Sequence, residues 1–168
     1  MLDISAALKA PGNIFNFSQE LAISPVMSLG EEVALDNVEL EGEFFGVGQV
    51  VSIRGTVYAT VHAHCARCLE PVEEEMEFPF EAEFSRTPDE DKDEYLITGH
   101  QVELEDAVRE AIVLGLPLRF LCDENCKGLC PQCGTNLNKG TCACGRGAES
   151  STRPNPFAAL ADWFSEDK

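Results

Sequence analysis

The sequence has no uninterrupted apolar run near the ~20 residues that a membrane-spanning helix needs. Its first residues, Met-Leu-Asp-Ile-Ser-Ala-Ala-Leu-Lys, have no basic segment followed by an apolar one, so we expect no secretory signal. It also has no phosphate-binding glycine-rich loop, no Gly-x-Ser-x-Gly elbow and no His-Glu-x-x-His helix. These absences predict a cytoplasmic protein that is not an enzyme and has neither a membrane partner nor a small-molecule substrate.

Basic residues are scarce and unevenly placed. The chain has 12 Lys and Arg against 30 Asp and Glu, a formal net charge of −18. Residues 1–118 hold 24 of the acids and 6 of the bases, whereas residues 119–153 hold 3 acids and 5 bases. Such a polyanion repels nucleic acid broadly. RNA contact would therefore be local, through Arg119, Lys127, Lys139, Arg146 and Arg153, or indirect, through a basic protein partner.

Cysteines are concentrated near the C-terminus. Six of the eight lie between Cys122 and Cys144, a clustering that favours metal over disulfides where thiols stay reduced. The segment Cys130-Pro-Gln-Cys133-Gly has the form of a zinc knuckle, because glycine after the second Cys permits the tight bend that both thiolates need. Cys142 and Cys144 follow closely enough to complete one tetrahedral Zn²⁺ site.

The remaining four cysteines could form a second zinc site. They are Cys65, Cys68, Cys122 and Cys126. The alternatives are one zinc ion with unligated cysteines, or exchange of Cys126 into the knuckle. His62 and His64 could substitute as ligands, but strand alternation places them on the face opposite Cys65. Four thiolates leave zinc no open position for water, so either site would be structural.

Alternating patterns predict strands through most of residues 1–121. Residues 38–44, 47–53, 56–64 and 78–84 alternate, and Arg54-Gly55 reads as a hairpin turn. Residues 102–115 have helical spacing, with acids in the first turn and Gly115 near the end. We therefore predict an α+β domain over 1–121, with an antiparallel sheet, open or barrel-like, and one main amphipathic helix.

Residues 122–168 form the predicted second part, a cysteine-rich zinc-binding tail. Asn155-Pro156 starts a short helix over 156–164. Its apolar residues are Phe157, Leu160, Trp163 and Phe164. A helix this short is marginal alone in water, so it must dock on its own domain or on a partner.

Four segments in order resemble one family. They are residues 65–71, beginning Cys65-Ala-Arg-Cys68, residues 106–118, residues 126–138, around Cys130-Pro-Gln-Cys133-Gly, and residues 153–160. The chain resembles the bacterial YceD family of large ribosomal RNA subunit accumulation proteins over roughly residues 45–165. The resemblance implies a non-enzymatic factor for synthesis, processing or stability of 23S rRNA, whose partner is the large ribosomal subunit precursor.

Two hypotheses describe how the protein would contact the large-subunit precursor. In one, the five bases named above touch phosphates of 23S rRNA; in the other, the acidic sheet captures a basic ribosomal protein or assembly factor. Two functions outside the ribosome also stay open. The cysteines could form a zinc-thiolate redox switch, or the zinc sites could serve a protein adaptor.

Overall fold

The computed structural model describes residues 1–28, 30–88 and 93–144. The chain divides into two compact units, Met1–Cys126 and Lys127–Lys168, and each is described by itself. The predicted helix over 156–164, with Phe157, Leu160, Trp163 and Phe164, lies outside the described residues, as do Arg146 and Arg153. The predicted division into 1–121 and 122–168 stays a prediction.

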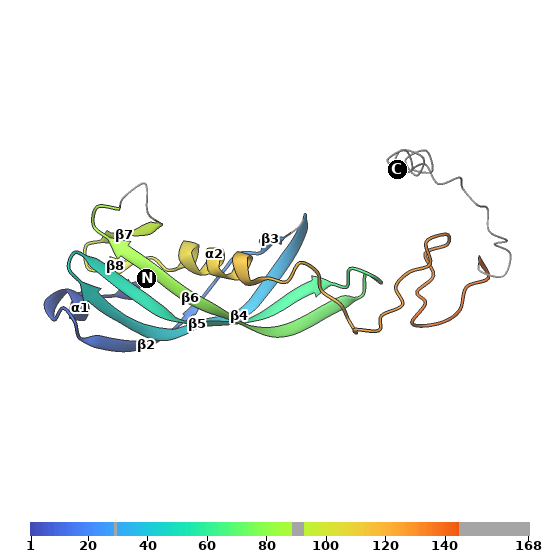
Figure 1. Ribbon diagram of the computed structural model, residues 1–168, viewed down its shortest axis with the longest axis horizontal. Helices are drawn as coiled ribbons and strands as arrows, with labels where there is room; N and C mark the ends of the chain where they lie inside the picture. The colour runs from blue at the N-terminus through green and yellow to red at the C-terminus, as the bar shows by residue number, and fades with distance from the viewer. Residues whose placement is uncertain (29, 89–92, 145–168) are drawn as a thin grey trace, which may run out of the picture. The chain divides into compact units, whose positions relative to one another are not determined.

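One eight-stranded sheet dominates the unit Met1–Cys126 (Figure 1). The strands are β1 (Leu2–Asp3), β2 (Ile14–Leu21), β3 (Val26–Ser28), β4 (Glu31–Val47), β5 (Val50–His64), β6 (Pro71–Ser85), β7 (Glu94–Thr98) and β8 (Gln101–Val102). Their order is β1-β8-β7-β6-β5-β4-β2, and β3 also pairs with β4. All of these pairings are antiparallel except β6 with β7. The described strands form a barrel-like sheet that stays open between β1 and β2.

Two helices complete the described fold, α1 (Ser5–Lys9) and α2 (Glu105–Gly115). α2 packs against β6 and buries Ala107, Val108 and Ile112. At its end Gly115 lies so close to Phe78 that an added Cβ would sit 2.5 Å from the ring. The predicted α+β class is confirmed in this coarse form. None of the helices in the described part of the chain is long and apolar enough to cross a membrane.

Alternation along the long strands builds the core. On β5 the inward residues are Val57, Ala59, Val61 and Ala63, and on β6 they are Phe78, Phe80, Ala82 and Phe84, all of them buried. The residues between them face outward, as the period of two requires. The turn residues Cys65 and Cys68 are buried as well. Core packing therefore extends to the end of the sheet where the first cysteines lie.

The predicted hairpin turn at Arg54-Gly55 is wrong. β5 runs through both residues, and the turn lies at Gly48-Gln49, where Val47 pairs with Val50 and Gly48 has φ +63°. Gly55 is instead the cross-strand partner of Gly42. A Cβ on Gly55 would lie 2.1 Å from the carbonyl oxygen of Glu41. Glycine is needed here because two backbones approach closely, which is its other role inside strands.

The helix boundary also differs from the prediction. We expected a helix over 102–115, but α2 begins at Glu105 and Val102 belongs to β8. Val102 pairs with Leu2 and with Ile97, so sheet pairing takes this residue before the helix can start. The short helix α1 was not predicted, because residues 1–45 have weak periodicity. Those residues supply β1, α1, β2, β3 and most of β4.

The close approach at Gly55 makes Gly55→Ala a sharp test of the fold. The added methyl group would force the backbones of β4 and β5 apart, and we expect a loss of about 3 kcal/mol in the free energy of unfolding. Urea denaturation followed by circular dichroism measures this loss. The neighbouring change Thr56→Ala, at a half-buried outward position, should cost less than about 1 kcal/mol. Equal effects of the two changes would contradict the close-approach explanation.

Candidate metal centres

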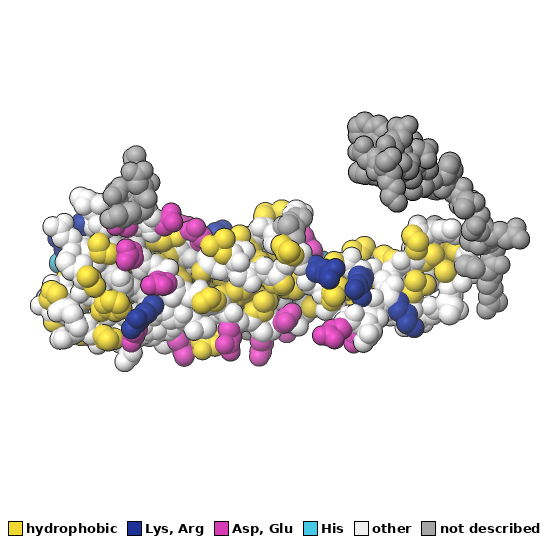
Figure 2. Space-filling model, viewed as in Figure 1, with side chains coloured by type: hydrophobic (Ala, Val, Ile, Leu, Met, Phe, Trp, Pro, Cys, Tyr) yellow, Lys and Arg dark blue, Asp and Glu magenta, His cyan; other side chains and the backbone are white. Residues whose placement is uncertain are grey.

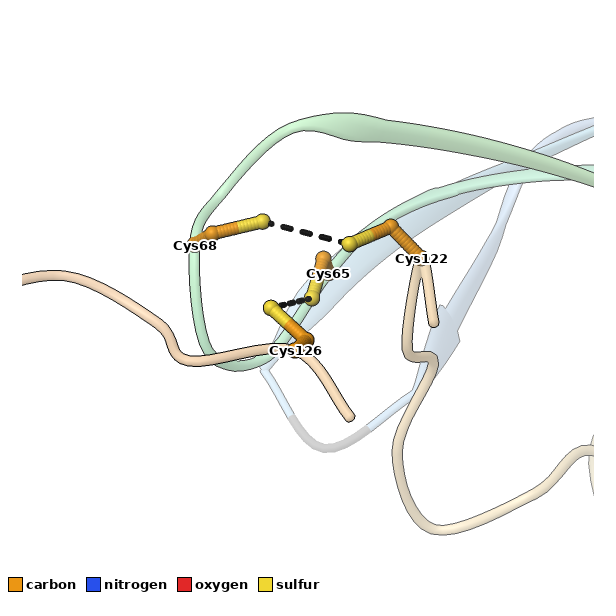
Figure 3. A group of neighbouring side chains, drawn as sticks. All are labelled: Cys65, Cys68, Cys122 and Cys126. Atoms are coloured by element: carbon orange, nitrogen blue, oxygen red, sulfur yellow. Dashed lines mark hydrogen bonds between the residues drawn. The ribbon is translucent and has the colours of Figure 1, made fainter. Parts of the chain in front are cut away.

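Four cysteines from two distant segments meet at one end of the sheet. We call Cys65, Cys68, Cys122 and Cys126 the sheet cluster (Figure 3). Cys65 directly follows β5, Cys68 lies in the turn to β6, and the other two come from the loop after α2. All four sulfur atoms lie within 4.8 Å of one another. Residues up to 61 positions apart in sequence are thus brought to a single point.

The sulfur geometry of the sheet cluster fits a tetrahedral metal ion. Zinc–sulfur bonds of about 2.3 Å imply sulfur–sulfur edges of about 3.8 Å in a regular tetrahedron. The Sγ atoms of Cys65 and Cys126 are 3.8 Å apart, and those of Cys68 and Cys122 are 3.5 Å apart. A disulfide would need about 2.0 Å, and none of the eight cysteines forms one. The residues present therefore fit a zinc ion.

The turn that carries Cys65 and Cys68 has a defined hydrogen-bond pattern. The N–H of Leu69 donates to the carbonyl of Cys65 at 2.9 Å, and the N–H of Cys65 donates to the carbonyl of Glu70 at 2.8 Å. Leu69 adopts φ +59°, in the left-handed region. A left-handed residue closes the turn tightly enough to aim both thiols toward the same point.

The other four cysteines form a second group, the knuckle cluster, whose turn has the same pattern. Its members are Cys130, Cys133, Cys142 and Cys144, with sulfurs within 4.8 Å of one another. The N–H of Gly134 donates to the carbonyl of Cys130 at 2.9 Å, and the N–H of Cys130 donates to the carbonyl of Thr135 at 2.8 Å. Gly134 has φ +72°. The two turns thus share both hydrogen bonds and a left-handed residue after the second cysteine, which is leucine in the sheet cluster and glycine in the knuckle cluster.

Acidity is distributed unequally within each cluster. Burial opposes ionisation of Cys65, but the backbone N–H groups of Cys122, Arg67 and Cys68 bond its sulfur and lower its pKa to about 6. Hydrogen bonding to Cys68 and Cys126, together with partial desolvation, raises the pKa of Cys122 to about 12. A thiol of lowered pKa thus lies in the same cluster as one of raised pKa, which keeps its proton at neutral pH.

The knuckle cluster repeats this arrangement. The hydroxyl and backbone N–H of Thr135 lower the pKa of Cys133 to about 6, while hydrogen bonding to Cys133 raises that of Cys144 to about 12. A dication removes the repulsion that keeps the remaining thiols protonated. Metal binding to either cluster must therefore displace protons, and it weakens as the pH falls.

Residues 127–144 have almost no apolar core of their own. Gly128 and Cys130 are the buried residues within this described segment. Its backbone is ordered by polar contacts, including the bridge between Leu129 and Asn136 and the bond from Lys127 N–H to the Asn138 side chain at 2.7 Å. Such a segment buries too little surface to fold on hydrophobic contacts alone. A metal ion at the knuckle cluster would supply the missing stabilisation.

Arg67 supports the sheet cluster, a role that sequence reasoning missed. Its guanidinium donates to the carbonyls of Glu124 and Cys126 at 3.1 and 2.9 Å. Nearby, the N–H of Ala66 donates to the carbonyl of Phe120 at 2.9 Å. These bonds fasten the loop after α2 to the β5–β6 turn. The available signal was the position of Arg67 between two ligand-type cysteines.

The two histidines beside the sheet cluster point elsewhere. His62 lies 3.0 Å from a carboxylate oxygen of Asp36, and His64 lies 2.8 Å from one of Glu31. Neither belongs to a cysteine cluster. The predicted phosphate-contacting residues Arg119, Lys127 and Lys139 are exposed, the first in the unit Met1–Cys126 and the others in the unit that follows.

Comparisons with known proteins point to one family. A family model described as "Large ribosomal RNA subunit accumulation protein YceD" matches residues 53–163, a range that includes all eight cysteines. An uncharacterized protein of Mycobacterium tuberculosis is 31% identical over 146 residues, covering 81% of this chain and 70% of the relative. One of Mycobacterium leprae is 26% identical over 149 residues, covering 82% and 67%.

A plant protein matches a shorter stretch. The "Large ribosomal RNA subunit accumulation protein YCED homolog 1, chloroplastic" of Arabidopsis thaliana is 39% identical over 46 residues, which cover 27% of this chain and 14% of that protein. No solved structure matches the chain.

Zinc content tests the two clusters separately. We expect two zinc ions per purified chain by mass spectrometry under native conditions, because each cluster offers a complete set of four thiols. Cys68→Ser and Cys133→Ser should each leave one ion, and the double variant none. Retention of two ions by both single variants would contradict the assignment of four cysteines to each site.

The left-handed Leu69 predicts a stabilising substitution. A non-glycine residue in this region costs about 1–2 kcal/mol, and glycine gives back part of that gain through its freer unfolded chain. Leu69 is 64% exposed, so little packing is lost with its side chain. Leu69→Gly should raise the free energy of unfolding of the zinc-loaded protein by about 0.5–1 kcal/mol, whereas β-branched Leu69→Val should lower it. Urea denaturation measures both; a loss with Leu69→Gly would show that the leucine side chain contributes more than its strained backbone.

Proposed function

Because the chain belongs to the YceD family, we propose that it is a non-enzymatic ribosome-biogenesis factor that supports synthesis, processing or stability of 23S rRNA in the large ribosomal subunit. The family match over residues 53–163 carries this proposal. On this proposal the protein acts in the cytoplasm on large-subunit precursors. It has two parts, an α+β domain over 1–121 and a zinc-binding tail over 122–168.

The proposed role of zinc is structural. Four thiolates saturate a tetrahedral ion and leave no position for a reacting water. When bound, zinc would supply cross-links: the sheet cluster would tie the loop after α2 to the β5–β6 turn, and the knuckle cluster would fold residues 127–144. The chain's own residues, the knuckle turns and Arg67, position the thiols for this purpose.

The charge on the sheet favours a basic protein as the direct partner. β6 carries six exposed glutamates and no Lys or Arg; they are Glu73, Glu74, Glu75, Glu77, Glu81 and Glu83. Figure 2 shows several acidic side chains spread over this part of the molecule on the face in view, some of them in a row along its lower edge, with apolar side chains between them. A surface of this charge attracts basic proteins and repels RNA phosphates. We therefore propose that the acidic sheet binds a basic ribosomal protein or assembly factor, with added apolar contact from Phe157, Leu160, Trp163 and Phe164.

Direct RNA binding is the competing mode within the same function. It would place Arg119, Lys127, Lys139, Arg146 and Arg153 on phosphates while the acidic body faces away. The net charge of −18 argues against a broad grip, because phosphate contact requires local neutralisation.

A sucrose gradient of gentle, low-salt lysate tests the function and separates the two modes. We expect the tagged protein to migrate with large-subunit precursors, and the ratio of 23S to 16S rRNA to fall on its depletion. A variant with the five bases changed to Glu should co-migrate as well as the wild type, because the acidic sheet makes the contact.

Loss of co-migration in that variant, with zinc content unchanged, would favour the RNA mode. Recovery of the wild type only at the top of the gradient, together with unchanged rRNA on depletion, would contradict a ribosomal role.

A further inference from the structure

A groove of about 720 Å³ runs between the edge of β6, the start of β7 and one side of α2. Its lining combines strand backbone, small apolar side chains and carboxylates. The lining includes Ala82 and Glu83 on β6, Glu94 at the start of β7, and Ala111 and Leu114 on α2.

One wall of the groove is a free strand edge. β6 pairs with β5 along its whole length, from Pro71 to Ser85. Its opposite edge pairs with β7 only at residues 83–85, and no strand among residues 1–28, 30–88 and 93–144 pairs with that edge from 71 to 82. A free edge presents backbone N–H and C=O groups that can bind a further strand.

The floor and rim of the groove are apolar. Ala82 and Ala107 are buried, and Ala111 packs partly against the core. Leu114, on the rim, is 79% exposed. Small side chains on this part of α2 leave room beside the strand edge, and the exposed leucine offers apolar contact to whatever enters.

Every charged residue that the structure places in the groove lining is acidic. The carboxylates belong to Glu81, Glu83, Asp93, Glu94 and Glu110, and among the described residues, which leave out 89–92 beside Asp93, no Lys, Arg or His lines the groove. Glu110 also accepts a hydrogen bond from the Tyr95 hydroxyl at 2.6 Å, which holds it on this wall. Carboxylates along an edge discourage pairing with neutral or acidic strands, including a second copy of this chain, and they favour a basic one.

Strand periodicity specifies the ligand further. Glu81 and Glu83 lie on the exposed face of β6, whereas Ala82 between them faces the core and α2. A strand added at this edge would place alternate side chains beside these glutamates and the others beside Ala111 and Leu114. The matching segment therefore alternates basic and apolar residues.

We propose that this groove binds an extended basic–apolar segment of a partner protein, which adds as a strand to the free edge of β6. The inference rests on the proposed function, since it specifies where a basic ribosomal protein or assembly factor would bind. Main-chain hydrogen bonds supply affinity in this mode, and the carboxylates and the apolar wall supply selectivity.

Two synthetic peptides test the mode of binding on the full zinc-loaded chain. One alternates Lys and Val over nine residues; the other alternates Lys and Pro and has the same charge, but its prolines lack an N–H and fix φ at about −65°, which disfavours a regular strand ladder. We expect fluorescence anisotropy to show binding of the Lys-Val peptide at least tenfold tighter than the Lys-Pro peptide. The amides of residues 77–82, except Pro79, which has none, should gain protection from hydrogen exchange only with the former.

A matched pair of variants locates the site. Glu81→Gln with Glu83→Gln should weaken binding of the Lys-Val peptide at least fivefold, whereas Glu74→Gln with Glu75→Gln, an equal charge change on exposed residues of the same strand, should not. Equal binding of both peptides, or equal weakening by both double variants, would show non-specific attraction and overturn the proposal. Protection of residues 77–82 that rises with protein concentration and is unaffected by peptide would assign the edge to a second copy and overturn it too.

The sucrose gradient described above tests the ribosomal role independently of the groove. Specific peptide binding by a protein that never co-migrates with precursors would support the groove and contradict the ribosomal role. Co-migration without specific peptide binding would support the role and overturn the groove.

Discussion

In both CxxC turns of this protein a left-handed residue follows the second cysteine, and the turn directs two thiols at one point. In the knuckle cluster Gly134 takes this conformation without strain, and in the sheet cluster Leu69 takes it with φ +59°. The remaining hydrogen bonds of the two turns are the same. The left-handed residue is thus the local feature that both four-sulfur groups share.

The two cysteine clusters lie in very different surroundings. The sheet cluster lies on a buried core, and its Cys65 and Cys68 are themselves buried, so a metal there would tie the loop after α2 to a structure that already has hydrophobic support. The knuckle cluster lies in a segment whose contacts are largely polar, so a metal there would supply most of the folding free energy. Loss of metal would therefore affect the two sites unequally.

Charge and topology together shape the surface available to partners. The sequence shows a net charge of −18, concentrated in residues 1–118, but it does not show which surface carries that charge. The structure shows that one part of it lines a groove beside an edge that β7 covers for only three residues. Acidic side chains at an open edge limit which strands can pair with it, so the negative charge at this place favours basic strands over neutral or acidic ones.

The sequence by itself determined the features that depend on local chemistry: the alternation from Val57 to Ala63 and from Phe78 to Phe84, most of α2, the knuckle at Cys130 and Cys133, and the family. It also suggested, by elimination, that Cys65 and Cys68 belong with Cys122 and Cys126. Only the tertiary structure decided what depends on segments far apart in the chain. The sequence predicts a turn at Gly55, whereas in the structure Gly55 pairs with Gly42 inside the sheet. It also predicts helix at Val102, whereas Val102 pairs with Leu2 in a strand. Three features leave no periodic signal in the sequence: the parallel β6–β7 pair, the free edge beside it, and the bonds from Arg67 to the 122–126 loop. The residues that meet in them are brought together by the packing of the whole sheet and not by their neighbours in the chain.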